Sequence, residues 1–150
     1  MSTIGFIGLG NMGFPMGELL SAAEHRLIVS DRDSAAVERF LARNPAAKPA
    51  AQPADWREAD VVITMLPNSD IVESVLLGSS GIASAASFNT LFIDMSSSDP
   101  LRSRALGQSL EQQGMRYLDA PVSGGVRGAQ SGQLAIMVGG RPQDLDGAKE

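Results

Sequence analysis

The sequence lacks the residues on which several classes of site depend. It contains no cysteine, which excludes disulfides and thiolate metal sites, and its single histidine, His25, leaves too few ligands for zinc. We therefore expect no bound metal. No run of about 18 apolar residues occurs, and no basic segment precedes an apolar run near the N-terminus. We expect no membrane span, no secretory signal and a cytoplasmic location.

Basic residues are few and dispersed. Ten arginines and two lysines are scattered among seventeen acidic residues, and the net charge is -5. Proteins that bind nucleic acid use clustered basic side chains to contact phosphates, so we expect no nucleic-acid partner. A content of 43% hydrophobic and 19% charged residues over 150 positions is typical of one globular domain spanning residues 1–150.

The most informative stretch is a glycine-rich turn between an apolar run at residues 4–7 and a helical segment at 14–23. Its residues are Gly8, Leu9, Gly10, Asn11, Met12 and Gly13. A strand, a glycine turn and a helix in this order are typical of a dinucleotide-binding site. Gly8 permits the tight turn, Gly10 leaves room for a pyrophosphate, and Gly13 lets the helix approach the strand. The pyrophosphate would lie at the helix N-terminus, where N–H groups lack intrahelical partners.

A second predicted strand, residues 26–30, carries the signal for cofactor choice. It ends in Asp31 and Arg32, about 20 residues beyond the glycine turn, where an acidic side chain would bind the ribose hydroxyls. Arg32 could instead hold the 2′-phosphate of NADP. Because Asp31 and Asp33 flank the arginine, the local field favours a neutral ribose. We predict a preference for NAD of about fivefold, with NADP as the alternative cofactor.

Strand and helix patterns alternate along the rest of the chain. Apolar runs at 61–65, 91–95, 116–119 and 134–138 predict buried strands, with at most a weak strand around Ala50. Helical spacing predicts helices over 34–41, 71–76 and 100–113, and from Pro142 onward, the first of them capped by Ser34. This order predicts a Rossmann-type doubly wound α/β fold, with a mostly parallel sheet and helices on both faces.

Polar and irregular segments follow several of these strands. Ligands of open α/β sheets lie beyond the carboxyl ends of the strands, so we expect Leu66 and Pro67 to contact the cofactor, unless they form a plain proline turn. Ser96 and Ser97 follow the next strand. One serine of the run 96–98 could cap the following helix, and the others could contact the cofactor. Residues 120–125 expose backbone N–H groups suited to an anion.

Together these motifs resemble the N-terminal domain of the β-hydroxyacid dehydrogenases, the family of 3-hydroxyisobutyrate dehydrogenase and tartronate semialdehyde reductase. The resemblance covers essentially all 150 residues and extends over four motifs: 8–13, 65–67, 94–97 and 119–125. It implies that a serine of the third motif approaches the nicotinamide. It also implies that Ser123, Gly124 and Gly125 hold the carboxylate of a small hydroxy acid, and that the parent protein is a homo-oligomer.

The sequence departs from that family at its far end. Members carry a catalytic lysine after the cofactor domain, followed by an all-helical domain, whereas the lysines here, Lys48 and Lys149, do not stand in the family pattern. We therefore expect no catalytic residue in this chain, with the family lysine beyond Glu150. The chain alone should bind cofactor without turnover, because acid–base catalysis needs a group within reach of the transferred proton. Hydride transfer between the nicotinamide and a β-hydroxy acid would belong to the full-length parent.

Two other classes remain open on the sequence alone. An imine reductase or a relative of 6-phosphogluconate dehydrogenase would share the glycine turn, and substrate profiling of the intact protein would separate these enzymes. A non-catalytic module that only binds the cofactor would also lack the lysine. The sequence beyond Glu150 would distinguish such a module from a dehydrogenase.

Overall fold

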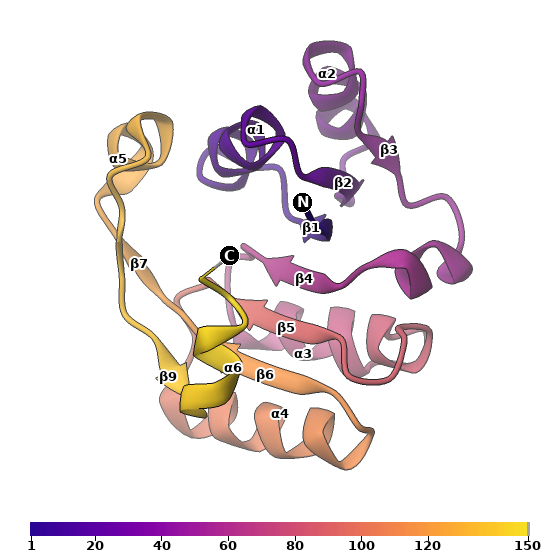
Figure 1. Cartoon of the computed structure of the whole chain (residues 1–150), viewed down its shortest axis with the longest axis vertical. Helices are drawn as coiled ribbons and strands as arrows, with labels where there is room; N and C mark the ends of the chain where they lie inside the picture. The colour runs from indigo at the N-terminus through magenta and orange to yellow at the C-terminus, as the bar shows by residue number, and fades with distance from the viewer. Residues whose placement is uncertain (150) are drawn as a thin grey trace.

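A computed structural model describes residues 1–149, which form a seven-stranded sheet with helices on both faces (Figure 1). The strand order is β3-β2-β1-β4-β5-β6-β9, parallel except at β9. The strands are β1 (Thr3–Ile7), β2 (Arg26–Ser30), β3 (Lys48–Pro49), β4 (Val61–Thr64), β5 (Leu91–Asp94), β6 (Arg116–Asp119) and β9 (Gly139–Gly140). The chain reverses its direction of winding between β3 and β4, which places β1 beside β4. The predicted doubly wound α/β fold is confirmed.

Within residues 1–149, six α-helices and two short 3-10 helices accompany the strands, and the last helix follows the final strand. They are α1 (Gly13–Ala22), α2 (Ser34–Arg43), η1 (Pro53–Glu58), α3 (Ser69–Leu77), η2 (Ile82–Ser84), α4 (Pro100–Gln112), α5 (Gly125–Ser131) and α6 (Pro142–Asp146). A separate antiparallel pair joins β7 (Val122–Ser123) to β8 (Ala135–Ile136). No helix within residues 1–149 is long and apolar enough to cross a membrane.

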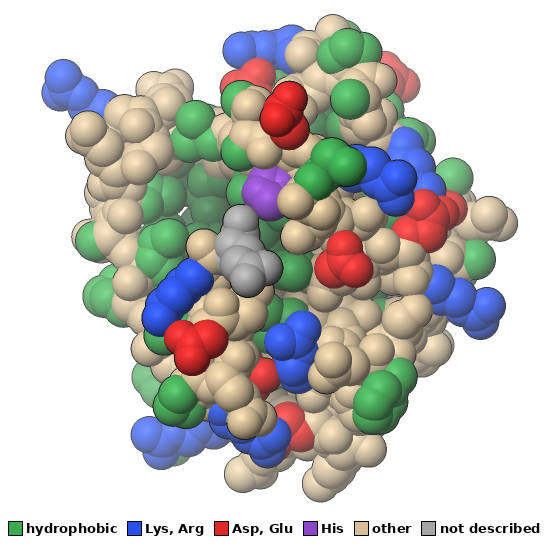
Figure 2. Space-filling view, viewed as in Figure 1, with side chains coloured by type: hydrophobic (Ala, Val, Ile, Leu, Met, Phe, Trp, Pro, Cys, Tyr) green, Lys and Arg blue, Asp and Glu red, His purple; other side chains and the backbone are tan. Residues whose placement is uncertain are grey.

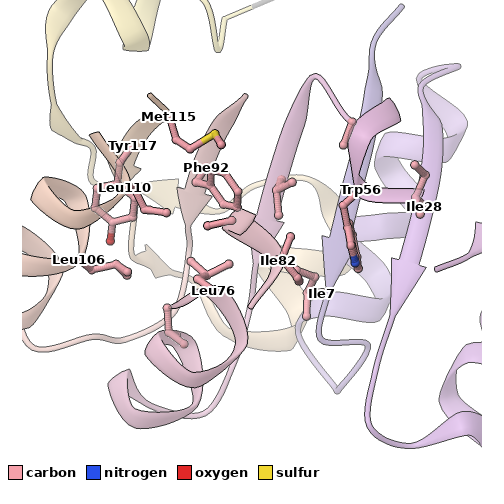
Figure 3. Close-up of a cluster of buried hydrophobic side chains, with 14 residues drawn as sticks. Ile7, Ile28, Trp56, Leu76, Ile82, Phe92, Leu106, Leu110, Met115 and Tyr117 are labelled. Atoms are coloured by element: carbon pink, nitrogen blue, oxygen red, sulfur yellow. The ribbon is translucent and has the colours of Figure 1, made fainter. Parts of the chain in front are cut away.

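Each face of the sheet has its own hydrophobic core. Strand residues alternate between the faces, so that Phe6 packs with α1 and α2 while Ile7 packs with α3 and α4. Figure 3 shows the second core, in which Ile28 of β2 and Trp56 of η1 lie at one end and Leu106 and Leu110 of α4 at the other. Burial on both faces explains why these strands read as continuous apolar runs.

Close packing of the layers depends on glycines on both sides of the sheet. A Cβ atom on Gly17 would lie 2.9 Å from Cε2 of Phe40, so the glycine lets α1 approach α2. On the other side of the sheet, a Cβ atom on Gly5 would lie 2.8 Å from Cζ3 of Trp56. Both positions hold the layers at their observed separation.

Two predicted helix caps are wrong. The cap of α2 is Asp33, whose carboxylate accepts a hydrogen bond from the Ala35 N–H, and Ser34 is the first helical residue. The cap of α4 is Asp99, which accepts from the N–H groups of Leu101 and Arg102. A carboxylate can take two such donors at once, so no serine of the run 96–98 is needed as a cap.

The predicted buried strand at 134–138 is also wrong. Only Ala135 and Ile136 form a strand, β8, and it pairs with β7 outside the main sheet. Ile136, Met137 and Val138 are between 41% and 54% exposed. Ile136 and Val138 border an apolar hollow of about 410 Å³ between α1, α5 and α6, where Figure 2 shows hydrophobic side chains gathered. The apolar run therefore faces this hollow instead of the sheet interior.

Candidate functional site

A cavity of about 600 Å³ opens at the carboxyl ends of β1, β2 and β4. This is the point where the direction of winding reverses, and in doubly wound sheets such a crevice is the expected ligand site. Three predicted segments meet there: the glycine turn, the end of β2 and the loop after β4. The predicted site residues that line the cavity are Gly8, Gly10, Asn11, Met12, Gly13, Asp31, Arg32, Leu66 and Pro67.

The glycine turn has the geometry that a pyrophosphate site requires. Gly8 has a φ of 100°, and a Cβ atom there would overlap the Met65 carbonyl oxygen. A Cβ atom on Gly13 would overlap the Gly8 carbonyl oxygen, so this glycine permits the close helix–strand contact. At Gly10, in contrast, a Cβ atom would meet nothing within 4 Å. The space in front of Gly10 is open, and it belongs to the cavity.

The N-terminus of α1 reaches the same cavity. Met12 precedes the helix and provides no side-chain hydrogen bond to the first-turn N–H groups. Met12 and Gly13 both line the cavity. The Phe14 N–H donates to the Gly10 carbonyl oxygen and Pro15 has no N–H, so the backbone of Met12 and Gly13 and the positive end of the helix dipole are what an anion in the cavity would meet.

Asp31 connects β2 to the glycine turn. Its Oδ2 accepts a hydrogen bond from the Leu9 N–H at 2.6 Å, and its Oδ1 accepts from the Asp33 N–H at 2.8 Å. Leu9 is buried and belongs to the site only through this backbone bond. Since each carboxylate oxygen can accept more than one hydrogen bond, Asp31 retains capacity for a ribose hydroxyl. Arg32 is exposed beside it.

The opposite wall of the cavity is apolar. Leu66 and Pro67 leave β4, and the side chains of Ile71 and Val75 on α3 and Ile82 on η2 complete the wall. The sequence predicts the α3 residues only as the apolar face of a helix and does not predict that they line the cavity. A flat apolar ligand such as an adenine ring could pack against this wall.

Ser96 and Ser97 do not line the cavity. Ser96 is fully buried, and its Oγ accepts a hydrogen bond from the Leu66 N–H at 2.9 Å. Ser97 is exposed at the neighbouring sheet edge. Ser96 thus lies beneath the β4 loop, while Ser97 is the one of the pair that solvent or a ligand can reach.

Ser123, Gly124 and Gly125 form an exposed turn apart from the cavity. Ser123 ends β7, and the turn continues through Gly124, with a φ of 134°, and Gly125, with a φ of 62°, into α5. A Cβ atom on Gly125 would meet nothing within 4 Å, so its backbone is accessible. α5 packs against α1, which keeps this turn on the α1 side of the sheet.

Two ionisable groups near the end of β6 are perturbed by burial. Burial, followed by the negative charge of Asp94, raises the pKa of Asp119. The same two causes raise the pKa of Tyr117, whose hydroxyl finds no hydrogen-bond partner. In both groups burial and the nearby negative charge disfavour the ionised form, and both groups lie at the end of β6, before the loop that leads to Ser123.

Neither lysine lies at the cavity. Lys48 Nζ pairs with Glu58 at 2.8 Å, and Lys149 Nζ pairs with Asp146 at 2.9 Å, both on the surface. The catalytic position predicted to lie outside this chain therefore has no substitute among these two side chains.

Comparison with known proteins agrees with this geometry. The family profile of the NAD binding domain of 6-phosphogluconate dehydrogenase matches residues 3–150. A probable mitochondrial 3-hydroxyisobutyrate dehydrogenase of Dictyostelium discoideum is 42% identical over 148 residues, which are 98% of this chain and 46% of that protein. The 3-sulfolactaldehyde reductase of Escherichia coli K12 is 38% identical over 149 residues, 99% of this chain and 49% of the reductase. The chain belongs to the β-hydroxyacid dehydrogenase family.

In each solved structure compared, this β-hydroxyacid dehydrogenase domain superposes on about half of the longer chain. The Mycobacterium tuberculosis 3-hydroxyisobutyrate dehydrogenase with L-serine superposes with a TM-score of 0.90 at 42% identity, covering 99% of this chain and 50% of that one. Psf3 in complex with NADP⁺ and 2-OPP gives 0.88 at 29% identity, covering 95% and 50%. An imine reductase of Myxococcus stipitatus with NAD⁺, 19% identical over 99% of this chain and 50% of that one, shares the fold at a TM-score of 0.88. The chain spans about half the length of the relatives it matches, as their NAD-binding domain.

Proposed function

We propose that this domain binds a nicotinamide dinucleotide in the 600 Å³ cavity, as the cofactor-binding half of an oxidoreductase acting on a small β-hydroxy acid. The observation that carries the proposal is the meeting of the glycine turn, Asp31 and the Leu66–Pro67 loop around one cavity. The bound nicotinamide would supply or accept the hydride. The chain's own residues would bind and orient the cofactor.

Each part of the cavity suits one part of such a cofactor. The open space at Gly10 and the uncapped N-terminus of α1 suit the pyrophosphate, whose oxygens would accept hydrogen bonds from backbone N–H groups. Asp31 would accept from the hydroxyls of the adenosine ribose. The apolar wall formed with Ile71 and Val75 would cover the adenine and exclude water from one face of it.

We propose NAD as the preferred cofactor. A 2′-phosphate would approach Asp31, which the Leu9 and Asp33 N–H groups hold in place and which would repel it. Arg39 Nη2 lies 3.8 Å from the Asp33 carboxylate, which compensates part of the positive charge of this arginine and so reduces its attraction for a 2′-phosphate. Arg32 alone would favour NADP, and the flanking carboxylates reduce its attraction for a phosphate.

We propose that the substrate carboxylate binds at Ser123, Gly124 and Gly125. The accessible backbone at Gly125 and the hydroxyl of Ser123 can donate hydrogen bonds to a carboxylate. The relatives at 38% to 42% identity are named for 3-hydroxyisobutyrate, a carboxylate, and 3-sulfolactaldehyde, a sulfonate, so both compounds are small molecules that carry one anionic group. The acid–base group and the cover over the nicotinamide would come from the rest of the parent protein.

The direct test is a calorimetric titration of the chain with NADH and with NADPH. We expect measurable binding at about millimolar cofactor, with NADH the tighter ligand, because the pyrophosphate site is complete. In a parallel ¹⁵N–¹H spectrum, the amides of Gly10, Gly13 and Leu66 should shift on NADH addition, and those of Gly139 and Gly140 should not. The absence of heat and of amide shifts with both cofactors would overturn the proposal.

A further inference from the structure

The loops after β4 and β5 are tied together beneath the cofactor cavity. The two strands are parallel neighbours, and their register places Thr64 beside Asp94 at the last position of each. The loop after β4 carries Leu66, which lines the cavity. The loop after β5 carries the serines 96–98, which do not. Contacts between the loops therefore determine where one wall of the cavity lies.

Asp94 is the centre of these contacts. Its side chain is fully buried, yet none of its hydrogen-bond partners is a lysine or an arginine. Its Oδ1 accepts from Thr64 Oγ1 at 2.8 Å and from the Ser96 N–H at 3.1 Å. Its Oδ2 accepts from Ser98 Oγ at 2.7 Å. A buried carboxylate is costly, and three short hydrogen bonds from neutral donors offset much of that cost.

These contacts continue to the cavity wall in one further step. The Ser96 N–H donates a hydrogen bond to Asp94, and the Ser96 hydroxyl oxygen accepts one from the Leu66 N–H at 2.9 Å. A second tie joins the same loops, because the Asp99 N–H donates to Ser69 Oγ at 2.9 Å at the start of α3. Asp94 therefore orients Ser96, and Ser96 fixes the backbone at Leu66.

We propose that Asp94 is a positioning residue of the cofactor site, one that holds the Leu66–Pro67 loop at the distance a bound cofactor needs. The inference rests on the proposed cofactor function of the cavity. Asp94 does not line the cavity and acts only through Ser96. A carboxylate suits the position because all three partners are donors. Asparagine would keep an acceptor for Thr64 and the Ser96 N–H, and its amide could donate to the Ser98 hydroxyl oxygen.

The first measurement reports loop position without any cofactor. Amide hydrogen exchange at Leu66 should be slow in the wild type, nearly as slow in Asp94→Asn, and about tenfold faster in Asp94→Ala and in Ser96→Ala. Leu110→Ala is the matched control, since Leu110 is fully buried on α4, in the core against which Leu66 packs, but takes no part in the hydrogen bonds between these loops. Leu110→Ala should leave Leu66 exchange unchanged under conditions where the fold is intact.

The second measurement is NADH affinity of the same variants. Asp94→Ala and Ser96→Ala should bind NADH about tenfold more weakly than the wild type, while Asp94→Asn and Leu110→Ala stay within about twofold. Unchanged exchange at Leu66 in Ser96→Ala, or wild-type NADH affinity in folded Asp94→Ala, would overturn the inference. Should Asp94→Ala fail to fold, Ser96→Ala decides alone. If the wild type binds neither NADH nor NADPH while exchange responds as expected, the proposed function fails and the loop positioning stands.

Discussion

Replacing Gly10 by valine should remove cofactor binding without disturbing the fold. A Cβ atom at this position would meet no atom within 4 Å, and the φ of Gly10 lies outside the left-handed region. The change therefore resembles a surface substitution, and we expect the free energy of unfolding to change by about 0.5 kcal/mol or less. The new side chain would occupy the space in front of the turn that we assign to the pyrophosphate.

The expected loss of affinity follows from the hydrogen bonds that would be displaced. Hydrogen bonds to a charged group contribute about 1.5–3 kcal/mol each, so losing two of them removes about 3 kcal/mol or more. This corresponds to an NADH dissociation constant raised about 100-fold or more. Calorimetry measures the affinity, and thermal unfolding by circular dichroism measures the stability of the same sample.

Gly139→Val is the control for this experiment. A Cβ atom on Gly139 would come no closer than 3.9 Å to the Asp119 carbonyl oxygen, and the residue does not line the cofactor cavity. This variant should bind NADH as the wild type does. If folded Gly10→Val also keeps wild-type affinity, the pyrophosphate does not lie against the glycine turn, and our reading of the cavity is refuted.

Three further predictions concern cofactor choice, turnover and pH. Asp31→Asn should shift the ratio of NADPH to NADH affinity about fivefold toward NADPH. It should also weaken NADH binding, because the new amide group would face the N–H of Leu9 or Asp33. Titration with both cofactors tests this prediction, and a wild type that prefers NADPH contradicts it. The chain alone should show no NAD-dependent oxidation of 3-hydroxyisobutyrate above background, and ordinary dehydrogenase turnover would show that the acid–base group is present after all. Asp119→Asn should raise the melting temperature at about pH 7 but not at about pH 3, since burial and Asp94 raise the pKa of Asp119, and its contribution to stability is lost as the pH rises through that pKa. If the variant and the wild type have equal melting temperatures at both pH values, the pKa of Asp119 is not raised.

The sheet could be predicted from the sequence because its strands are buried on both faces. The bounds predicted for β2 and β6 are confirmed to the residue, since polar or turn-forming residues flank each apolar run. The run at 134–138 is equally apolar, but only Ala135 and Ile136 form a strand, and this strand lies outside the main sheet. Hydrophobicity indicates that a segment avoids water, but it does not indicate whether a strand partner or an open hollow receives it.

The residues around the cavity were predictable to the extent that they follow strands. Parallel strands bring their carboxyl ends to one edge of the sheet, so the sequence alone predicts that the glycine turn, Asp31 and Leu66 lie together. The role of Asp94 could not, because it depends on the register between β4 and β5. The one available signal was that Thr64 and Asp94 stand at corresponding positions near the ends of successive predicted strands.

Trp56 gives the molecule an internal optical reporter. It is the only tryptophan of the chain, it is 7% exposed, and it lies in a hollow whose lining residues Ser30, Val75 and Ile82 also line the cofactor cavity. Indole emission overlaps the absorption of reduced nicotinamide but not that of the oxidised form. Excitation of Trp56 should therefore transfer energy to bound NADH, which then emits, whereas bound NAD⁺ should accept no energy. One emission spectrum would then distinguish the redox state of the ligand in an unlabelled protein.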